Sequence, residues 1–434
     1  MKYIYLAKQY NLVVGDKFEL FYRGVIRLHN PYQYYILVSC PKGNPYPRYF
    51  TYTPKENEVG SYSLKIQLID NDNNVIDEGE TTLVVEKPNK PDRKINILCI
   101  GDSLTVNGVW PQVGYTRVCL NEDAPKGLNY GDVLNFMGTC KVETEGHEVG
   151  YEGYGGWTWK SYCTNDHIGL NSSVWITTKH QMTEEDQHSL WQSNGYIWIL
   201  ETIEATRLKF KRGPNNVSML SNLGKTLKHV ANAKHQNELT IETFEYEKTN
   251  PFWDKEKEDI SFKNYMKQNK FRIPDLIYIL LTWNGLYVPY NHDFSHHIDY
   301  AKVILRKIHK EYPLAKVTLL GIQICSVNGG IAASYGATGP YHDTFGTISS
   351  AFYYNEALEE LSNDPEFSAY TDYVDTKGQF DSEYNMPSVL TPVNARSKTT
   401  ELIGVNGVHP NMDGYLQIGD AFYRKLVFDL NKIK

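Results

Sequence analysis

The spacing of apolar residues changes near residue 90. Before that point, short runs alternate between apolar and polar positions and are separated by turn residues. In the run 60–70, Tyr62, Leu64, Ile66 and Leu68 share one face, as in a half-buried antiparallel strand. Similar runs cover residues 17–28, 32–40, 48–54 and 81–88. The pattern predicts a small all-β sandwich of the Ig-like type over residues 1–90.

From Lys94 onward, apolar runs alternate with amphipathic segments. The continuous runs at 95–100, 274–285 and 316–326 are typical of buried strands in a parallel sheet. The segment 299–313 has helical periodicity, and residues 414–430 form a second predicted helix. The inward positions of the first helix are Ala301, Ile304, Leu305 and Ile308. This alternation predicts an α/β domain over residues 95–434 with a doubly wound parallel sheet.

Two stretches interrupt these patterns. The Pro-rich, polar stretch Glu86–Lys94 is typical of a linker, and residues 91–94 of it separate the two predicted domains. Residues 162–246 are polar and irregular, with a predicted helical segment at 221–236. We interpret 162–246 as an insertion in the α/β domain that lies over its functional site.

Length and composition narrow the function classes. A chain of 434 residues is long enough for two domains. It carries 44 Lys and Arg against 51 Asp and Glu, with no basic run, which disfavours nucleic-acid binding. The 33 tyrosines suit either sugar rings or an ordinary core. The six cysteines show no metal-ligand spacing, so no metal site is expected, and Cys99 and Cys325 are predicted to be buried thiols in a reducing compartment.

The sequence also bears on location. The first residues lack the long apolar region of a secretion signal, and no stretch is long enough to cross a membrane. We therefore expect a cytoplasmic protein without membrane association. The alternative is a protein that leaves the cell without a signal peptide, such as a virion component.

The stretch "INILCIGDSLTVNGVW" carries the first candidate for chemistry, Ser103. It follows a buried strand and the break at Gly101 and Asp102, so it sits where a strand of a parallel sheet turns into a helix. A serine there either caps the helix or presents a nucleophile at the sheet edge. His409, in a loop just before the predicted last helix, can reach the same edge and is a suitable base for the Ser103 hydroxyl.

Four sequence blocks together resemble those of the SGNH hydrolases, the GDSL esterase/lipase family. They occur in the family's order: "IGDSLT", "EGYGGWTW" from Glu152, "PDLIYILLTWNG" from Pro274, and "NGVHPNMDGY" near the end. The resemblance covers about Lys94 to Lys434. It implies the flavodoxin-like three-layer α/β/α fold of this family, and an esterase without a metal or organic cofactor.

The resemblance also implies residue roles. Ser103 is the nucleophile, His409 the general base, and the backbone N–H of Ser103, Gly156 and Asn284 form the oxyanion hole. Both oxyanion-hole residues also have a simpler interpretation. Gly156 and the preceding glycine form a turn before a core aromatic residue, and Asn284 forms a turn at a strand end. Substrate-contacting residues are expected to be Asp102, Gly155, Trp157 and Trp283.

This sequence departs from the family at two places. The third block usually has Gly-x-Asn-Asp, and here only Asn284 is kept. The family's aspartate three residues before the histidine is replaced by Asn406. An amide oxygen can accept the Nδ1–H bond of His409 and fix its tautomer, but it cannot stabilise the imidazolium by charge.

Family members with an attached β-sandwich are often carbohydrate esterases. We therefore expect hydrolysis of an ester, with O-acetyl groups on a poly- or oligosaccharide as the first substrate class. The alternative is a weakly active or inactive polysaccharide-binding or structural protein, for example a phage tail or decoration protein. The N-terminal domain is then the expected contact for virion partners or for a second copy of the chain.

Overall fold

The computed structural model describes residues 2–120, 128–165, 173–177, 198–204, 206–212, 240–245, 250–281, 283–286, 288–336 and 342–433. The chain divides into two compact units. The first contains Met1–Gly153 and Phe271–Lys434, and the second contains Tyr154–Lys270. The helical segment expected at 221–236 lies outside the described residues.

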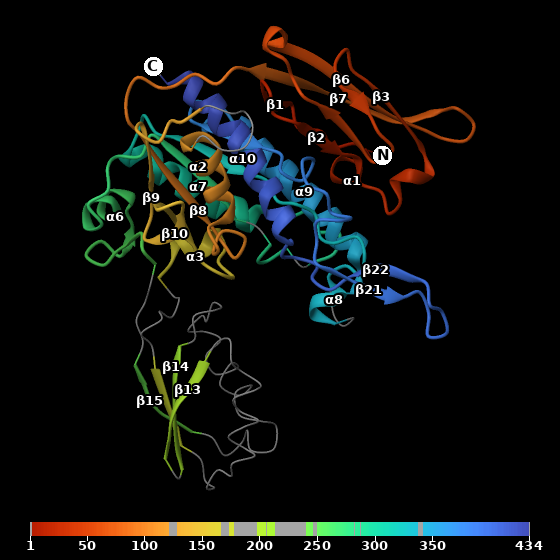
Figure 1. The fold of residues 1–434 in the computed structure, drawn as a ribbon. Coiled ribbons are helices and arrows are strands. Elements are labelled where there is room, and N and C mark those ends of the chain that lie inside the picture. Colours follow the sequence, from red (N-terminus) through yellow and green to blue (C-terminus); the bar gives the residue numbers. More distant parts are fainter. Residues whose placement is uncertain are drawn as a thin grey trace. The chain divides into compact units, whose positions relative to one another are not determined.

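The N-terminal part of the first unit consists of short strands in two sheets (Figure 1). One sheet has the order β1-β7-β6-β3 and the other the order β2-β5-β4. Their bounds are β1 (Gln9–Val13), β2 (Phe18–Phe21), β3 (Tyr35–Ser39), β4 (Asn44–Pro45), β5 (Tyr49–Tyr52), β6 (Gly60–Ile69) and β7 (Val75–Glu86). Side chains of both sheets share one hydrophobic cluster, and the inward positions of β6 (Leu64, Ile66 and Leu68) are fully buried, as predicted.

Two details of this part differ from the sequence expectation. The run expected as one strand over 17–28 is interrupted by the short helix α1 (Tyr22–Val25). Gly24 lies so close to the backbone of Lys377 that any side chain would overlap its carbonyl oxygen. The first strand, β1, has no counterpart in the expected set and pairs in parallel with β7. Short 3-10 helices cover Pro31–Gln33 and Glu56–Glu58.

A mostly parallel sheet forms the centre of the first unit, which confirms the prediction of an α/β protein. Its strand order is β10-β11-β8-β18-β19-β20, and β9 also pairs with β8. All the pairs are parallel except β10 with β11. The strands are β8 (Ile95–Gly101), β9 (Leu134–Met137), β10 (Cys140–Thr144), β11 (His147–Gly153), β18 (Leu276–Leu280), β19 (Lys316–Leu320) and β20 (Thr371–Val374).

Helices cover this sheet. They are α2 (Val109–Cys119), α7 (Ser295–Glu311), α9 (Thr344–Asn363) and α10 (Met412–Lys432), and the first unit also has the short helix α8 (Ala332–Tyr335). α2 and α10 pack against each other, and the Phe422 ring of α10 contacts Trp110 of α2 and Tyr278 of β18. α7 buries the four predicted positions, so its helical period was predicted correctly. A hairpin of β21 (Ser388–Pro392) and β22 (Thr400–Gly404) precedes α10.

The second unit includes a four-stranded sheet of order β13-β14-β12-β15. Its elements are α3 (Trp159–Cys163), β12 (Ser173–Thr177), β13 (Trp198–Glu204), β14 (Arg207–Arg212), β15 (Thr240–Glu245), β16 (Trp253–Asp254), β17 (Asp259–Ile260) and α6 (Phe262–Gln268). The sequence expectation of an insertion at 162–246 falls within this unit.

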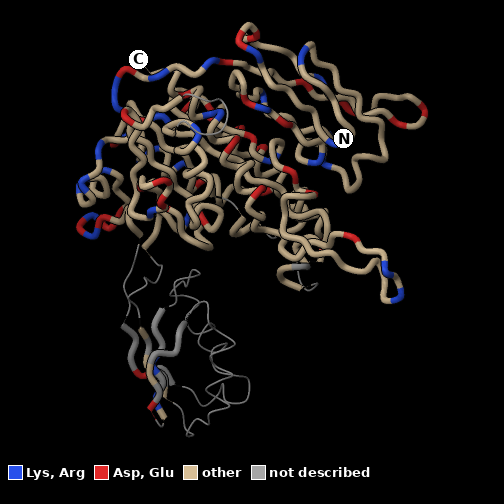
Figure 2. Tube along the Cα trace, in the orientation of Figure 1, with Lys and Arg blue, Asp and Glu red and all other residues tan. Residues whose placement is uncertain are grey.

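Acidic and basic residues are interspersed along the described trace of the first unit (Figure 2). Cys99 and Cys325 are fully buried, as predicted. Within the described ranges, no helix is both long enough and apolar enough to cross a membrane.

Candidate active site

The carboxyl end of β8 forms a tight turn that presents Ser103. Asp102 holds this turn from inside, because its Oδ1 accepts the N–H of Leu104 at 2.9 Å and its carbonyl accepts the N–H of Thr105 at 2.9 Å. Asp102 is fully buried, whereas Ser103 is half-buried. The turn therefore leaves the serine hydroxyl at the surface of the sheet edge.

Gly101 is required by the close packing under this turn. A Cβ at this position would overlap Thr105 Oγ1 and come within 2.6 Å of the Leu280 carbonyl oxygen. Thr105 Oγ1 is itself fixed, because it accepts the indole N–H of Trp110 at 2.9 Å. A glycine at the end of β8 lets the turn approach the neighbouring strand β18.

His409 meets Ser103 although 306 positions separate them in the chain. His409 Nε2 lies 2.9 Å from Ser103 Oγ, which is hydrogen-bond distance. His409 lies in the loop between β22 and α10, near the C-terminus of the chain, and this loop brings it to the carboxyl end of β8. Within the described ranges, the backbone N–H of Ser103 has no acceptor and is available as a donor.

The other side of the His409 ring has no carboxylate partner among the residues that the structure describes. Burial lowers the pKa of His409 from its ordinary value of 6.5. A neutral imidazole is the form that can accept a proton from the serine hydroxyl. The described part of the site is therefore a Ser–His pair in which burial favours the neutral form of the base.

Asn406 supports His409 in a way that the sequence did not suggest. Its Oδ1 accepts the backbone N–H groups of Val408 and His409, both at 2.9 Å, and the hydroxyl of Ser334 at 3.3 Å. The expected bond to Nδ1 of the imidazole is replaced by these bonds, because an Asn side chain readily caps N–H groups two and three residues ahead. Asn406 thus shapes the loop and leaves the ring nitrogen to other partners.

Residues far away in the sequence hold the same loop. The buried Gln323 donates from Nε2 to the Val408 carbonyl at 2.9 Å, and the N–H of Ser326 donates to the Gly407 carbonyl at 3.2 Å. Both follow β19 as isolated polar residues in an apolar run. The sequence analysis did not identify these two residues. The one signal that could have found them is a polar side chain within an apolar, buried run.

Asn284 lies beside the Ser103 turn. Its Nδ2 is 3.5 Å from Asp102 Oδ2. The next residue, Gly285, has φ +97°, and a Cβ there would lie 2.7 Å from the His297 ring. His297 of α7 is therefore a second support that the sequence did not reveal, since it packs under the turn that carries Asn284.

Two of the predicted substrate-contacting residues are buried. Asp102 and Trp283 are 0% and 1% exposed, so their side chains are covered by protein. Asp102 is engaged in holding the turn and the Asn284 amide. That these two side chains contact substrate therefore stays a prediction.

The three predicted residues of the second block belong to the second unit. Gly156 has φ +77°, a left-handed conformation that favours glycine. Trp157 stacks on Tyr154 with ring centres 4.4 Å apart and meets Tyr162 edge-on at 4.7 Å. The roles of Gly155, Gly156 and Trp157 at the site stay predictions. Across the described ranges there is no group of three His, Cys, Asp or Glu residues suited to a metal ion.

Comparison with known proteins gives one kind of match. No protein-family model and no curated protein matches the chain. Among solved structures, it is similar to a Streptococcus pneumonia protein provisionally described as a platelet activating factor, with 12% identity, a TM-score of 0.31, and coverage of 77% of this chain and 85% of that one. A peptidoglycan O-acetylesterase aligns with 10% identity, a TM-score of 0.27, and coverage of 78% and 92%.

A third similar structure is a Chitinophaga pinensis protein described as a possible lipase, with 12% identity, a TM-score of 0.29, and coverage of 77% and 99%. All three TM-scores are below 0.5. The function proposed below therefore rests on the residues and the side-chain geometry of this chain.

Proposed function

We propose that the protein is a serine ester hydrolase. The observation that carries the proposal is the 2.9 Å contact between Ser103 Oγ and His409 Nε2 at the carboxyl edge of a parallel sheet. A serine hydroxyl is a weak nucleophile unless a base takes its proton, and a half-buried neutral imidazole at this distance is such a base. A capping serine needs no histidine at this position.

The reaction proceeds through an acyl-enzyme. Ser103 Oγ attacks the ester carbonyl while its proton passes to His409 Nε2, and a tetrahedral intermediate forms. Its oxyanion accepts hydrogen bonds from the Ser103 N–H, with Asn284 Nδ2 and the Gly156 N–H as the further donors in this proposal. His409 then protonates the leaving alcohol, the C–O bond breaks, and water activated by the same imidazole releases the acid. The protein or water supplies every proton donor and acceptor in these steps.

For the substrate we propose an O-acetyl group on a poly- or oligosaccharide. The support is the resemblance of the four sequence blocks to the SGNH hydrolases, together with the β-strand region that precedes the parallel sheet.

The first test is hydrolysis of 4-nitrophenyl acetate and release of acetate from acetylated polysaccharides. Ser103→Ala and His409→Ala are each expected to lose nearly all turnover. The matched controls Ser349→Ala, which removes a buried hydroxyl without a hydrogen-bond partner in the described residues, and His147→Ala on β11 are expected to keep it.

A fluorophosphonate probe separates the chemistry from the choice of substrate. Such probes react with activated serines, and labelling at Ser103 that needs His409 supports the hydrolase even where acetyl esters are not cleaved. Turnover that survives in Ser103→Ala, or a wild-type protein that is neither labelled nor active, overturns the proposal and favours a binding or structural role.

A further inference from the structure

The loop that carries His409 is fixed on one side by residues 326–330. The Gly404 N–H donates to the Asn328 carbonyl at 2.5 Å, and the Ser326 N–H donates to the Gly407 carbonyl at 3.2 Å. Asn328 also reaches away from the loop, because its Nδ2 donates to the Glu383 carbonyl at 3.1 Å. Asn328 therefore connects this side of the loop to Glu383 by hydrogen bonds.

The segment 381–387 borders the other side of the same loop. The Val405 N–H donates to the Pro387 carbonyl at 2.8 Å, and the Asn411 N–H donates to the Asn385 carbonyl at 3.2 Å. These two contacts stand on either side of His409 in the sequence. The segment 381–387 thus supports both ends of the loop.

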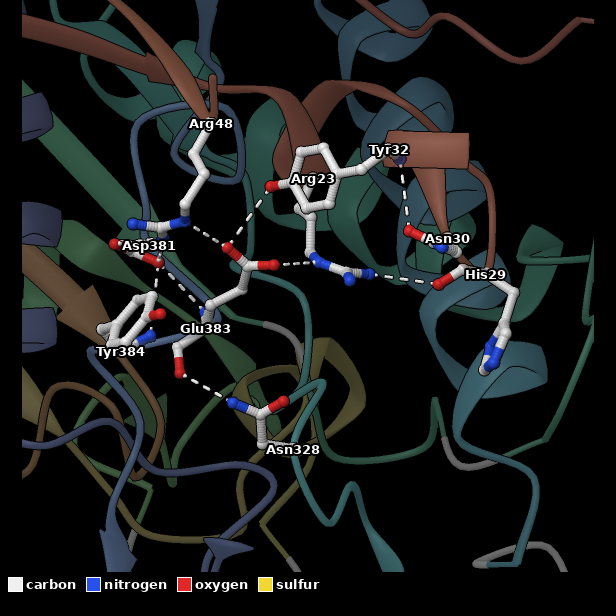
Figure 3. Close-up of polar contacts among 9 residues, drawn as sticks. All are labelled: Arg23, His29, Asn30, Tyr32, Arg48, Asn328, Asp381, Glu383 and Tyr384. Carbon is white, nitrogen blue, oxygen red and sulfur yellow. Dashed lines mark hydrogen bonds and ion pairs between the residues drawn. The ribbon is translucent and has the colours of Figure 1, made fainter. Parts of the chain in front are cut away.

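Two arginines from the N-terminal part of the chain, one in α1 and one just before β5, hold this segment by the Glu383 carboxylate (Figure 3). Arg23 of α1 pairs with Oε1, and Arg48 donates to Oε2 at 2.5 Å. Arg48 also binds both carboxylate oxygens of Asp381, at 2.7 and 2.8 Å. The Tyr32 hydroxyl donates to Glu383 at 3.3 Å.

This cluster is built for fixed geometry. The Glu383 side chain is only 12% exposed, and its carboxylate has a partner on both oxygens. Burial opposes ionisation of Glu383, but the hydrogen bonds from Arg23 and Arg48 outweigh it and lower its pKa. Charge-assisted pairs of this kind are directional, and loss of one partner leaves a poorly solvated charge.

We propose that Glu383 is a positioning residue for His409, and that Arg23 and Arg48 make the N-terminal strands part of the active-site framework. The proposal rests on the proposed function, since it concerns the base of that reaction. Removing the Glu383 charge releases the segment 381–387, and both ends of the His409 loop then lose a fixed support. A base that is displaced from Ser103 slows proton transfer, whereas substrate binding is little affected.

The test compares Glu383→Gln with Glu366→Gln. Glu366 also pairs with an arginine, Arg306, at 2.6 and 2.8 Å, but it is exposed and lies near the start of β20 instead of beside the loop. At a temperature at which circular dichroism shows both variants to be folded, Glu383→Gln is expected to lower kcat for 4-nitrophenyl acetate about tenfold with KM within about twofold. Labelling of Ser103 by a fluorophosphonate is expected to slow by the same factor, and Glu366→Gln to match the wild type.

Further variants guard against a simple folding defect. Arg23→Lys and Arg48→Lys keep the charge and are expected to lie between the wild type and Glu383→Gln. Combining Arg48→Met with Glu383→Gln is expected to slow labelling less than the product of the single effects, because both act through one contact.

The outcomes separate the two proposals. A Glu383→Gln variant that melts earlier but keeps its kcat and its labelling rate makes Glu383 a stability residue and overturns the positioning role alone. A wild-type protein that is neither labelled nor active overturns the proposed function, and with it this inference.

Discussion

Replacing Asn406 tests the most direct disagreement between the sequence expectation and the structure. Its Oδ1 accepts two backbone N–H groups and a hydroxyl, and one of those N–H groups belongs to the buried Val408. Asn406→Ala removes this acceptor, and with it all three hydrogen bonds, while it keeps the backbone. The loop that carries His409 then has donors that face no partner.

The cost follows from these contacts. A buried donor without a partner costs about 1–3 kcal/mol, and the N–H of the half-buried His409 costs less because water reaches it. We therefore expect Asn406→Ala to lose about 2–4 kcal/mol of unfolding free energy, and kcat to fall because the imidazole is held less firmly. The control is Asn394→Ala, which removes a similar 3.0 Å acceptor from the exposed tip of the β21–β22 hairpin.

Asn406→Asp gives the complementary result. It keeps the acceptor oxygens and places a negative charge near the imidazole, which favours the protonated form and raises the pKa of His409. Because only the neutral imidazole accepts the serine proton, the acidic limb of kcat/KM is expected to move to higher pH. Urea unfolding and pH–rate profiles with 4-nitrophenyl acetate measure both effects. An Asn406→Ala variant with wild-type stability and kcat, or an Asn406→Asp variant with an unmoved acidic limb, refutes this role for Asn406.

Three further outcomes follow from the contacts described above. Burial lowers the pKa of His409 from 6.5, so the imidazole is protonated only at lower pH than a free histidine. The acidic limb of wild-type kcat/KM is therefore expected below pH 6.5, and a limb above that value contradicts this. Gly101→Ala places a Cβ against Thr105 and is expected to cost about 1–3 kcal/mol and to slow labelling of the serine, so unchanged urea unfolding counts against the packing argument. Asp16→Asn breaks buried pairs with two arginines, one of them Arg424, and is expected to cost about 3–5 kcal/mol in urea unfolding; a loss below 1 kcal/mol contradicts it.

Features that depend on neighbouring residues can be predicted from the amino-acid sequence. The apolar run of β8, the break at Gly101 and the placement of Ser103 after it follow from local backbone chemistry. The helical period of α7 named its buried face correctly, and the alternation in β6 did the same. These patterns involve residues that are close together in the chain, so they can be predicted without the tertiary structure.

The tertiary structure decided what depends on residues far apart in the chain. His409 was a candidate base from its loop, but its 2.9 Å contact with Ser103 joins residues 306 positions apart in the chain. The sequence set Asn406 in the place of an acid, whereas the folded loop turns its oxygen to two backbone N–H groups. Whether an amide oxygen meets a ring nitrogen or a backbone donor is decided by the path of the loop, which residue identity does not specify.

The same reason explains the cluster around Glu383. Neither Arg23 nor Arg48 stands out in the first 90 residues, and Glu383 lies in an irregular segment more than 330 positions away. A side chain becomes a partner only when packing brings an opposite charge to it and removes water from both. Sequence pattern fixes the strands and helices, and their packing selects which polar groups are buried together.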